Sequence, residues 1–252
     1  MNFANKCVLI TGGSRGIGRA CAMAFAQRGA RVAVNYKSNA AAAQATLDSL
    51  PGGPHISVQA DVEDAEAVRI MINEVVSELG QLDIVVNNAG IYTPHPIDIV
   101  NYEDWQRSWQ ETLSVNLIGP ANVCYCAAQY MKIMGGGRLI NVSSRGAFRG
   151  EPGQPAYGAS KAGLNAMSQS LAQALARYNI IVGIVAPGFV ETDMAKDILA
   201  SPAGEEIRQQ SPFGRVAKPE EVAQAVLFLA ADGSEFMSGT IIDVNGASYL
   251  RS

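Results

Sequence analysis

Two residues in the second half of the chain, Tyr157 and Lys161, have the types and the spacing needed for proton transfer. They lie four positions apart in a segment with helical character that begins at Pro155, and side chains at this spacing share one face of a helix. A tyrosine hydroxyl titrates at a pKa of roughly 10, and a neighbouring ammonium group favours the phenolate. The pair could therefore exchange a proton at neutral pH, although the same spacing also occurs on solvated helix faces.

Two further polar residues, Asn116 and Ser144, precede this pair at positions that suit an active site. Ser144 follows residues 138–142, an apolar segment that predicts a buried strand. Ligands of open α/β sheets bind at the carboxyl ends of the strands. Asn116 lies within a predicted helical stretch over residues 102–134, where a polar side chain can disturb the backbone hydrogen bonds. Ser143 stands beside Ser144, so the strand end alone does not decide between the two serines.

A phosphate site is predicted near the N-terminus. A glycine-rich turn at residues 11–18 separates the apolar segment 7–10 from a helix expected over residues 16–28. Free backbone N–H groups and the helix dipole both favour an anion at the start of such a helix. Because a strand precedes the turn and a helix follows it, the context is the one that dinucleotide binding requires.

The elements that must position these residues alternate between strands and helices along the whole chain. We expect strands at residues 7–10, 31–35, 56–60, 84–87, 138–142, 180–185 and 241–244, with helices between them. This alternation predicts an α/β fold, a doubly wound Rossmann fold with a seven-stranded parallel sheet and helices on both faces. No linker or break in composition divides the 252 residues, so we expect a single domain over residues 1–252.

Composition argues against several classes of function. The net charge is −4 and no basic run is present, so we expect no nucleic-acid partner. No apolar segment reaches the roughly 18–20 residues that cross a membrane, and the first residues lack a signal-peptide pattern, so we expect a cytoplasmic protein. The four cysteines and two histidines have no metal-site spacing, and we expect no metal and reduced thiols.

In combination, these motifs resemble the short-chain dehydrogenase/reductase family. The glycine turn, residues 87–90, and a serine thirteen positions before Tyr157 occur in the family's order and spacing, between about residues 6 and 246. The resemblance implies an NAD(P)-dependent oxidoreductase with catalytic residues Asn116, Ser144, Tyr157 and Lys161. Ser144 would bind a carbonyl oxygen and Tyr157 would transfer the proton. Lys161 would lower the tyrosine pKa and hold the nicotinamide ribose, and Asn116 would mark a kink whose freed carbonyl holds a water.

The resemblance also implies a cofactor site. Asp61 would contact the adenine, with a turn or helix cap as its alternative role, and Asn88 would tie neighbouring strands together. Val190, through its backbone, and Thr192, through its hydroxyl, would meet the carboxamide. The full set comprises Gly12, Ser14, Arg15, Gly16, Ile17, Gly18, Tyr36, Lys37, Ser38, Asp61, Val62, Asn88, Ala89, Gly90, Tyr157, Lys161, Pro187, Gly188, Val190 and Thr192.

The end of the second predicted strand bears on the choice between NADP(H) and NAD(H). A carboxylate there would accept hydrogen bonds from the 2′-hydroxyl of NAD and repel a 2′-phosphate. Residues 35–38 contain no carboxylate, and both Lys37 and Arg15 can reach the same pocket. The sequence therefore favours NADP(H) over NAD(H), with a merely solvated Lys37 as the alternative.

Within the family, residues 87–91, 187–194 and 214–222 most resemble the 3-oxoacyl-acyl-carrier-protein reductases. This likeness implies NADPH-dependent reduction of a ketone carbonyl, possible substrates being 3-oxoacyl thioesters of a carrier protein or of CoA. The alternatives are dehydrogenation of a sugar, a secondary alcohol or a diketone. A regulator that binds the cofactor without catalysis should have lost one of the four catalytic residues. Arg145 and Arg149 are the cations expected to meet an acidic carrier protein.

The resemblance has two further implications. Residues 190–216 show weak periodicity and are expected to form a mobile lid over the substrate. Members of the family are usually homotetramers that associate through the two long helices and the last strand, so we expect a homotetramer here.

Overall fold

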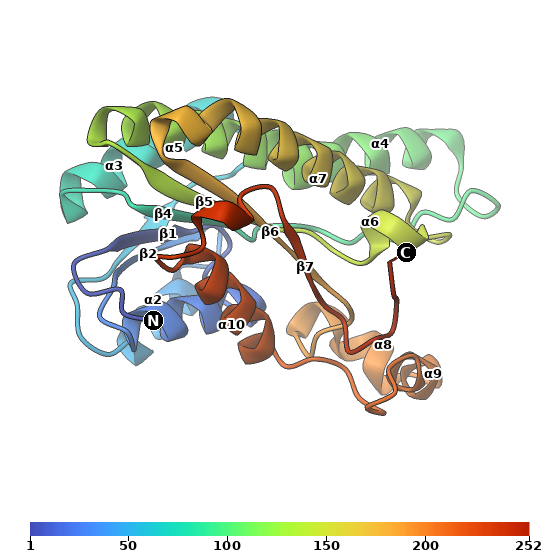
Figure 1. Cartoon of the computed structure of the whole chain (residues 1–252). Coiled ribbons are helices and arrows are strands. Elements are labelled where there is room, and N and C mark those ends of the chain that lie inside the picture. The colour runs from blue at the N-terminus through green and yellow to red at the C-terminus, as the bar shows by residue number, and fades with distance from the viewer. Residues whose placement is uncertain (252) are drawn as a thin grey trace.

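The computed structural model describes residues 1–251 and contains one seven-stranded sheet (Figure 1). The strands are β1 (Cys7–Ile10), β2 (Arg31–Tyr36), β3 (Ile56–Gln59), β4 (Ile84–Asn87), β5 (Gly137–Val142), β6 (Ile180–Pro187) and β7 (Ile241–Val244). Their spatial order is β3-β2-β1-β4-β5-β6-β7, and every neighbouring pair is parallel. The predicted fold class is confirmed. Because the strand order reverses between β1 and β4, a ligand crevice is expected at the carboxyl ends of these strands.

Helices cover both faces of this sheet. They are α1 (Gly16–Ala26), α2 (Ala40–Ser49), α3 (Ala65–Leu79), α4 (Tyr102–Leu113), α5 (Gly119–Met134), α6 (Gly146–Arg149), α7 (Pro155–Leu175), α8 (Lys196–Ala200), α9 (Ala203–Gln209) and α10 (Pro219–Ala230). In Figure 1, α3, α5 and α7 lie above the sheet, whereas α2 and α10 lie below it. Helix α1 packs against α10 on this lower face. Helices α8 and α9 project beyond both layers.

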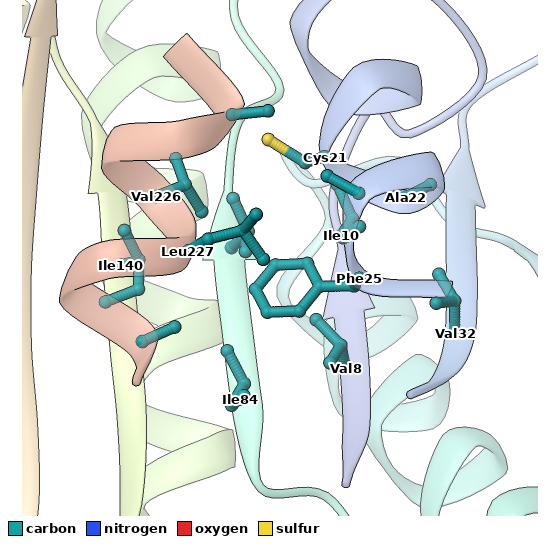
Figure 2. Close-up of a cluster of buried hydrophobic side chains, with 14 of the residues drawn as sticks. Val8, Ile10, Cys21, Ala22, Phe25, Val32, Ile84, Ile140, Val226 and Leu227 are labelled. Atoms are coloured by element: carbon teal, nitrogen blue, oxygen red, sulfur yellow. The ribbon is translucent and has the colours of Figure 1, made fainter. Parts of the chain in front are cut away.

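The alternation of side chains along each strand explains why the sheet needs both layers. In β1, Val8 and Ile10 belong to the apolar cluster formed with α1 and α10, while Leu9 belongs to the cluster formed with α3 and α5. Figure 2 shows Phe25 of α1 packed between Val8 and Leu227 of α10. A strand that is buried on both faces has a continuous apolar sequence, which is why these strands could be recognised as short apolar segments.

The largest departure from the predicted elements lies within residues 102–134, which we expected to be one helix. A π-helical turn, Ser114–Ile118, separates α4 from α5, and the Gly119 N–H bonds to the Ser114 carbonyl. Such turns insert one residue into a helix and occur frequently at functional sites. A Cβ on Gly119 would lie 2.9 Å from the Val62 carbonyl oxygen, so glycine permits the close approach of α5 to the segment after β3.

Smaller differences affect the ends of other elements. The first helix ends at Ala26 rather than at residue 28, because the chain turns at Gly29, which has a φ of 87°. Strands β2 and β6 run one and two residues past their predicted ends. The segment between β5 and α7 contains the short helix α6, and the expected lid contains α8 and α9.

The expected lid segment is anchored at its base. Val190 pairs with Ala217 in an isolated parallel bridge, and the Glu191 N–H donates to the Ala217 carbonyl at 2.8 Å. The two ends of residues 190–217 therefore meet, with α8 and α9 between them. Within residues 1–251, no helix combines the length and the apolar character that crossing a membrane requires.

Candidate active site

The four residues predicted to be catalytic come from three elements that meet at the carboxyl edge of the sheet. Ser144 follows β5, Asn116 lies in the π turn, and Tyr157 and Lys161 lie in the first turns of α7. The Lys161 Nζ lies 5.9 Å from the centre of the Tyr157 ring. A Cβ on Gly90 would lie 3.2 Å from Asn116 Oδ1 and 3.6 Å from Lys161 Nζ. The amide and the ammonium group therefore both face this glycine.

Asn116 is fully buried and its amide holds two neighbouring segments. Its Oδ1 accepts from the Ile91 N–H at 2.8 Å, and its Nδ2 donates to the Ile91 carbonyl at 2.9 Å and to Ser160 Oγ at 3.2 Å. The expected kink at Asn116 is present as the π turn, which turns this amide toward Ile91 and α7. The water expected beside it stays a prediction.

Lys161 is buried, with 5% of its surface exposed, and its Nζ donates to the Val142 carbonyl at 2.9 Å. Burial lowers the pKa of Lys161 to about 8 because the charged form loses its hydration. The neighbouring Ser143 hydroxyl donates to the Lys161 carbonyl at 3.4 Å. Ser143 is thus engaged with the backbone of α7, which favours Ser144 as the serine available to a substrate.

Ser144 and Tyr157 form the centre of the site. Ser144 Oγ accepts from the Gly146 N–H at 3.0 Å, so its own proton remains available for donation. Burial raises the pKa of Tyr157, and a hydrogen bond with Ser144 opposes part of that rise. The Tyr157 ring packs edge-to-face against Tyr92 with 4.8 Å between ring centres. Burial is the largest effect on this pKa, and the expectation that Lys161 lowers it stays a prediction.

His95 is a positioning residue that the sequence did not reveal. The ring is fully buried and lies 5.6 Å from the ring of Trp105, measured between centres. Its Nε2 lies 3.1 Å from the Ala156 N–H, and its Nδ1 lies 2.8 Å from the Thr93 carbonyl. This arrangement assigns the proton to Nδ1 and makes Nε2 the acceptor for the first turn of α7, one residue before Tyr157. The only sequence signal was a histidine between two prolines.

The glycine turn fits a dinucleotide phosphate group. Gly12 has a φ of 61°, and a Cβ on Gly18 would collide with the Gly12 carbonyl and lie 2.6 Å from Asn88 Nδ2. No side chain caps the N-terminus of α1, and its first turn contains no acidic residue. The free N–H groups there can therefore bind an anion. Ser14 and Ile17 lie within this turn and the start of α1.

Two other predicted segments reach the glycine turn. Asn88 Nδ2 donates to the carbonyls of Thr11 and Gly12 at 3.0 and 3.1 Å, which ties the end of β4 to the end of β1, as expected. A Cβ on Gly16 would lie 3.2 Å from Thr192 Cγ2. The structure thus brings residues 88–90 and 187–192 beside residues 12–18. Within residues 187–192, the Gly188 N–H donates to the Val244 carbonyl at 3.0 Å.

At the far end of the cofactor crevice, Tyr36, Lys37 and Ser38 terminate β2. Lys37 is exposed, and its Nζ lies 2.7 Å from Asp61 Oδ2 and 2.8 Å from Glu63 Oε2. These carboxylates raise the pKa of Lys37. Lys37 is therefore neither a free cation nor a merely solvated charge.

Arg15 is the other cation expected at this end of the crevice. It is exposed and forms no ion pair within residues 1–251. Val62, the predicted cofactor residue that follows Asp61, is buried. Of the two cations predicted to meet the 2′-phosphate, Arg15 is the one not held by a carboxylate.

Arg145 is not placed as a docking residue for a carrier protein. Only 3% of its surface is exposed. Its Nη1 donates to Ser248 Oγ and its Nη2 to Gln210 Oε1, each at 2.5 Å, and its guanidinium stacks on Phe189. The expectation of a surface cation at this position is wrong, because the side chain turns inward between the lid and the C-terminal segment. Arg149 is partly exposed and lies 3.7 Å from a Glu151 oxygen.

Comparison with known proteins agrees with this geometry. Residues 12–247 match the family described as enoyl-(acyl carrier protein) reductase. The 3-oxoacyl-[acyl-carrier-protein] reductase of Staphylococcus aureus (strain Mu50) is 38% identical over 247 residues, covering 97% of this chain and 98% of that protein. The enzyme of the same description from Thermotoga maritima is 39% identical over 254 residues, covering 99% and 100%.

Solved structures give the same assignment. A dehydrogenase/reductase from Sinorhizobium meliloti 1021 is 34% identical with a TM-score of 0.90, covering 99% of this chain and 97% of that one. A variant of a Serratia marcescens short-chain dehydrogenase/reductase is 32% identical, also with a TM-score of 0.90, covering 98% and 99%. Because sequence and fold agree over nearly their full lengths, the chain belongs to the short-chain dehydrogenase/reductase family and is an NAD(P)-dependent oxidoreductase.

Proposed function

We propose that this protein uses NADPH to reduce a ketone carbonyl, with a 3-oxoacyl thioester of a carrier protein or of CoA as the first candidate substrate. The observation that carries the proposal is that Ser144, Tyr157 and Lys161 meet at the end of β5, where Ser144 affects the tyrosine pKa and the Lys161 Nζ lies 5.9 Å from the centre of the Tyr157 ring. The 3-oxoacyl reductases named above support the thioester, and their similarity extends over the whole chain.

The residues divide the reaction between them. Bound NADPH supplies the hydride that the carbonyl carbon accepts. Ser144 donates a hydrogen bond to the carbonyl oxygen, where negative charge develops. Tyr157 donates the proton to that oxygen, and burial favours its protonated form before the transfer. The Lys161 ammonium stabilises the tyrosinate that remains after the transfer.

Asn116 positions these groups without touching the substrate. Its amide binds both Ile91 and Ser160, so it fixes the loop after β4 relative to the first turns of α7. Ser160 in turn donates to the Tyr157 carbonyl at 2.7 Å. The backbone at Tyr157 is therefore linked to the π turn through Ser160 and Asn116.

We infer a preference for NADPH over NADH from Arg15, which is free to meet a 2′-phosphate. Lys37 contributes less than its position at the end of β2 suggested, because Asp61 and Glu63 already neutralise it. The preference is measured as the ratio of kcat/KM for the two cofactors.

The test of the proposed reaction is cofactor oxidation with a panel of substrates. The panel contains an acetoacetyl thioester, a simple β-ketoester, a diketone, a ketose and a crotonyl thioester. We expect reduction of the acetoacetyl thioester with NADPH and none of the crotonyl compound, because the hydroxyl pair is built to protonate an oxygen. Tyr157→Phe should lower kcat at least about 100-fold while NADPH still binds. Tyr102→Phe, on the exposed face of α4, should leave kcat unchanged.

Other outcomes lead to other functions. Turnover of the ketose or the diketone alone would move the substrate to the sugar or alcohol class. Reduction of the crotonyl thioester would contradict the carbonyl assignment. Tight NADPH binding without oxidation by any member of the panel would favour a regulator that binds the cofactor.

We also propose a homotetramer, located in the cytoplasm. Exposed apolar side chains on the π turn and α5 support an assembly: Ile118, Tyr125 and Ile133 are 51%, 67% and 84% exposed. Light scattering should give a mass near four times 26.6 kDa, and a monomer would contradict the proposal. The free cysteines, three of them buried, support a reducing compartment. A fusion to a fluorescent protein that located outside the cytoplasm would refute this location.

We propose that residues 190–216 act as a lid that closes over the substrate. The support is their arrangement, two short helices on a base fixed by the pairing of Val190 with Ala217. Amide hydrogen exchange in α8 and α9 should slow when NADPH and a ketone bind together. Unchanged exchange would contradict the lid.

A further inference from the structure

Arg145 is a buried cation without a counterion. Its exposed fraction is 3%, and within residues 1–251 no carboxylate lies within ion-pair distance of its guanidinium. Its two side-chain hydrogen bonds go to neutral acceptors, Ser248 and Gln210. Burying an unpaired charge is strongly unfavourable, and residues in this state in a cleft are candidates for function.

The neighbouring acid does not neutralise Arg145. Glu151 lies close enough to affect it electrostatically, but its nearer partner is Arg149 at 3.7 Å. Burial raises the pKa of the Glu151 carboxyl, and both Arg149 and Arg145 oppose that rise. Burial and Arg149 lower the pKa of Arg145 to about 10, so Arg145 still carries its charge at neutral pH.

The guanidinium borders a cavity of about 150 Å³ between the lid and the C-terminal segment. Phe189, Ser211 and Ser248 also line this cavity, and its one acidic residue, Glu221, is bound to Arg215 at 2.6 Å. With two arginines and one carboxylate, the lining has a net positive charge. A carboxylate or phosphate is therefore better suited to this space than a neutral or cationic group.

Arg145 also connects this cavity to the reacting groups, because it lines the cavity and adjoins Ser144 in the chain. Arg145 directly follows Ser144, and its backbone N–H donates to the Pro187 carbonyl at 2.8 Å. Its charge lowers the otherwise raised pKa of Tyr92, whose ring contacts that of Tyr157. Arg145 therefore acts electrostatically on the tyrosine that packs against Tyr157, and its backbone adjoins the serine expected to bind the carbonyl oxygen.

We propose that Arg145 binds an anionic group of the substrate, a carboxylate or a phosphate ester attached near the reacting carbonyl. The inference rests on the proposed ketone reduction and narrows its substrate class. The planar guanidinium can hold such a group through two parallel hydrogen bonds. Arg145 is thus a specificity residue, and a thioester substrate would carry its anion on the acyl side.

Matched substrates with and without the charge test this inference. The pairs are acetoacetate with methyl acetoacetate, levulinate with methyl levulinate, and dihydroxyacetone phosphate with dihydroxyacetone. The first two pairs report on a carboxylate at two distances from the carbonyl, and the third reports on a phosphate. In the wild-type enzyme we expect kcat/KM for at least one anion to exceed that of its neutral partner by about tenfold or more.

Variants then assign the effect to Arg145. Arg145→Gln should lower kcat/KM for that anion about 100-fold and change the neutral partner less than about threefold, and Arg145→Lys should restore part of the loss. Arg107→Gln is the matched control, since Arg107 is exposed on α4, its partner is Asp104, and its replacement should affect both substrates alike. If Arg145 had only a structural role, its replacement would lower kcat/KM for both members of a pair together.

The remaining outcomes separate this inference from the proposed function. Equal wild-type rates for every pair would overturn the role of Arg145 while leaving ketone reduction intact, and this comparison needs no variant to fold. No turnover of any ketone would refute the proposed function itself. A raised KM for NADPH in Arg145→Gln, equal for acid and ester, would assign the cofactor's phosphate to Arg145 and refute the inference.

Discussion

The two ends of the predicted cofactor crevice each contain a lysine, and the two lysines have opposite surroundings. Lys37, at the adenosine end, is exposed and bound to Asp61 and Glu63, and these carboxylates raise its pKa. Lys161, at the catalytic end, is buried against a single carbonyl oxygen, and burial lowers its pKa to about 8. The exposed lysine carries a charge that neighbouring carboxylates already neutralise, whereas the buried lysine carries a charge close to its titration point.

The contribution of each charge to the free energy of folding depends on its surroundings. Exposed ion pairs contribute about 0–1 kcal/mol, because water and salt screen them. A buried ammonium group loses its hydration, and one carbonyl replaces only part of it. The catalytic end should therefore dominate both activity and stability, and three experiments test this contrast.

The largest effect is expected from Lys161→Met. Activity should fall at least about 100-fold, because the tyrosinate loses its stabilising charge. The unfolding free energy at pH 7 should rise by about 2 kcal/mol: roughly 3 kcal/mol from removing a pKa depressed from 10.5 to about 8, less about 1 kcal/mol for the lost bond to Val142.

The difference in unfolding free energy between Lys161→Met and the wild type depends on pH. Below pH 8, Lys161 is charged in both the folded and unfolded states, so the wild type bears the full cost. Between about pH 8 and 10.5 the unfolded state binds more protons, and wild-type stability rises with pH. Urea unfolding should therefore show the advantage of Lys161→Met shrinking above pH 8. An advantage that is constant, or absent at pH 7, would contradict a buried ammonium.

The next effect is the pH dependence of reduction. As the pH rises through about 8, Lys161 loses its proton while Tyr157, whose pKa is raised, keeps its own. The rate constant kcat should fall about tenfold between pH 7 and 9. NADPH binding, followed by fluorescence, provides the control and should change little. A rate that stayed flat to pH 10 would show that the charge of Lys161 does not matter to catalysis.

The smallest effect is expected at the adenosine end. Glu63→Gln removes one of the two carboxylates on Lys37 and frees its charge for a 2′-phosphate. The NADPH-to-NADH ratio of kcat/KM should rise by about two- to fivefold, as for an exposed pair. Glu66→Gln is the matched control, because Glu66 pairs with Arg69 instead. A change above about 50-fold would contradict the contrast between the two ends.

Local signals in the sequence accounted for most of the fold. Helix α3 lies between two predicted strands and has a local signal at each end: Asp64 caps its start by accepting from the N–H groups of Glu66 and Ala67, and Gly80 ends it with a φ of 77°. Both signals lie within a few residues of the helix. The π turn has one local signal, the polar Asn116, which indicated a kink; the number of residues in the turn could not be predicted, because helices continue on both sides of it.

For the site too, the sequence predicted some features and not others. The motifs placed Asn116, Ser144, Tyr157 and Lys161 in the chain, but not the directions of their pKa shifts, which depend on burial by other elements. The side-chain partners of Arg145 are 65 and 103 residues away, at Gln210 and Ser248. Only the packing of the lid and the C-terminal segment shows that this arginine turns inward.

The π turn also makes the active site sensitive to length as well as to composition. One added residue rotates everything beyond it by about 100° about the helix axis. Deleting any one of residues 114–118 would allow a continuous α-helix to form without changing the residue type at any other position. Helices α4 and α5 could then no longer both turn their present faces toward the molecule, and the amide of Asn116 would leave Ile91. The rotation of α5 relative to α4 therefore depends on the number of residues in the π turn, and the proposed role of Asn116 depends on that rotation.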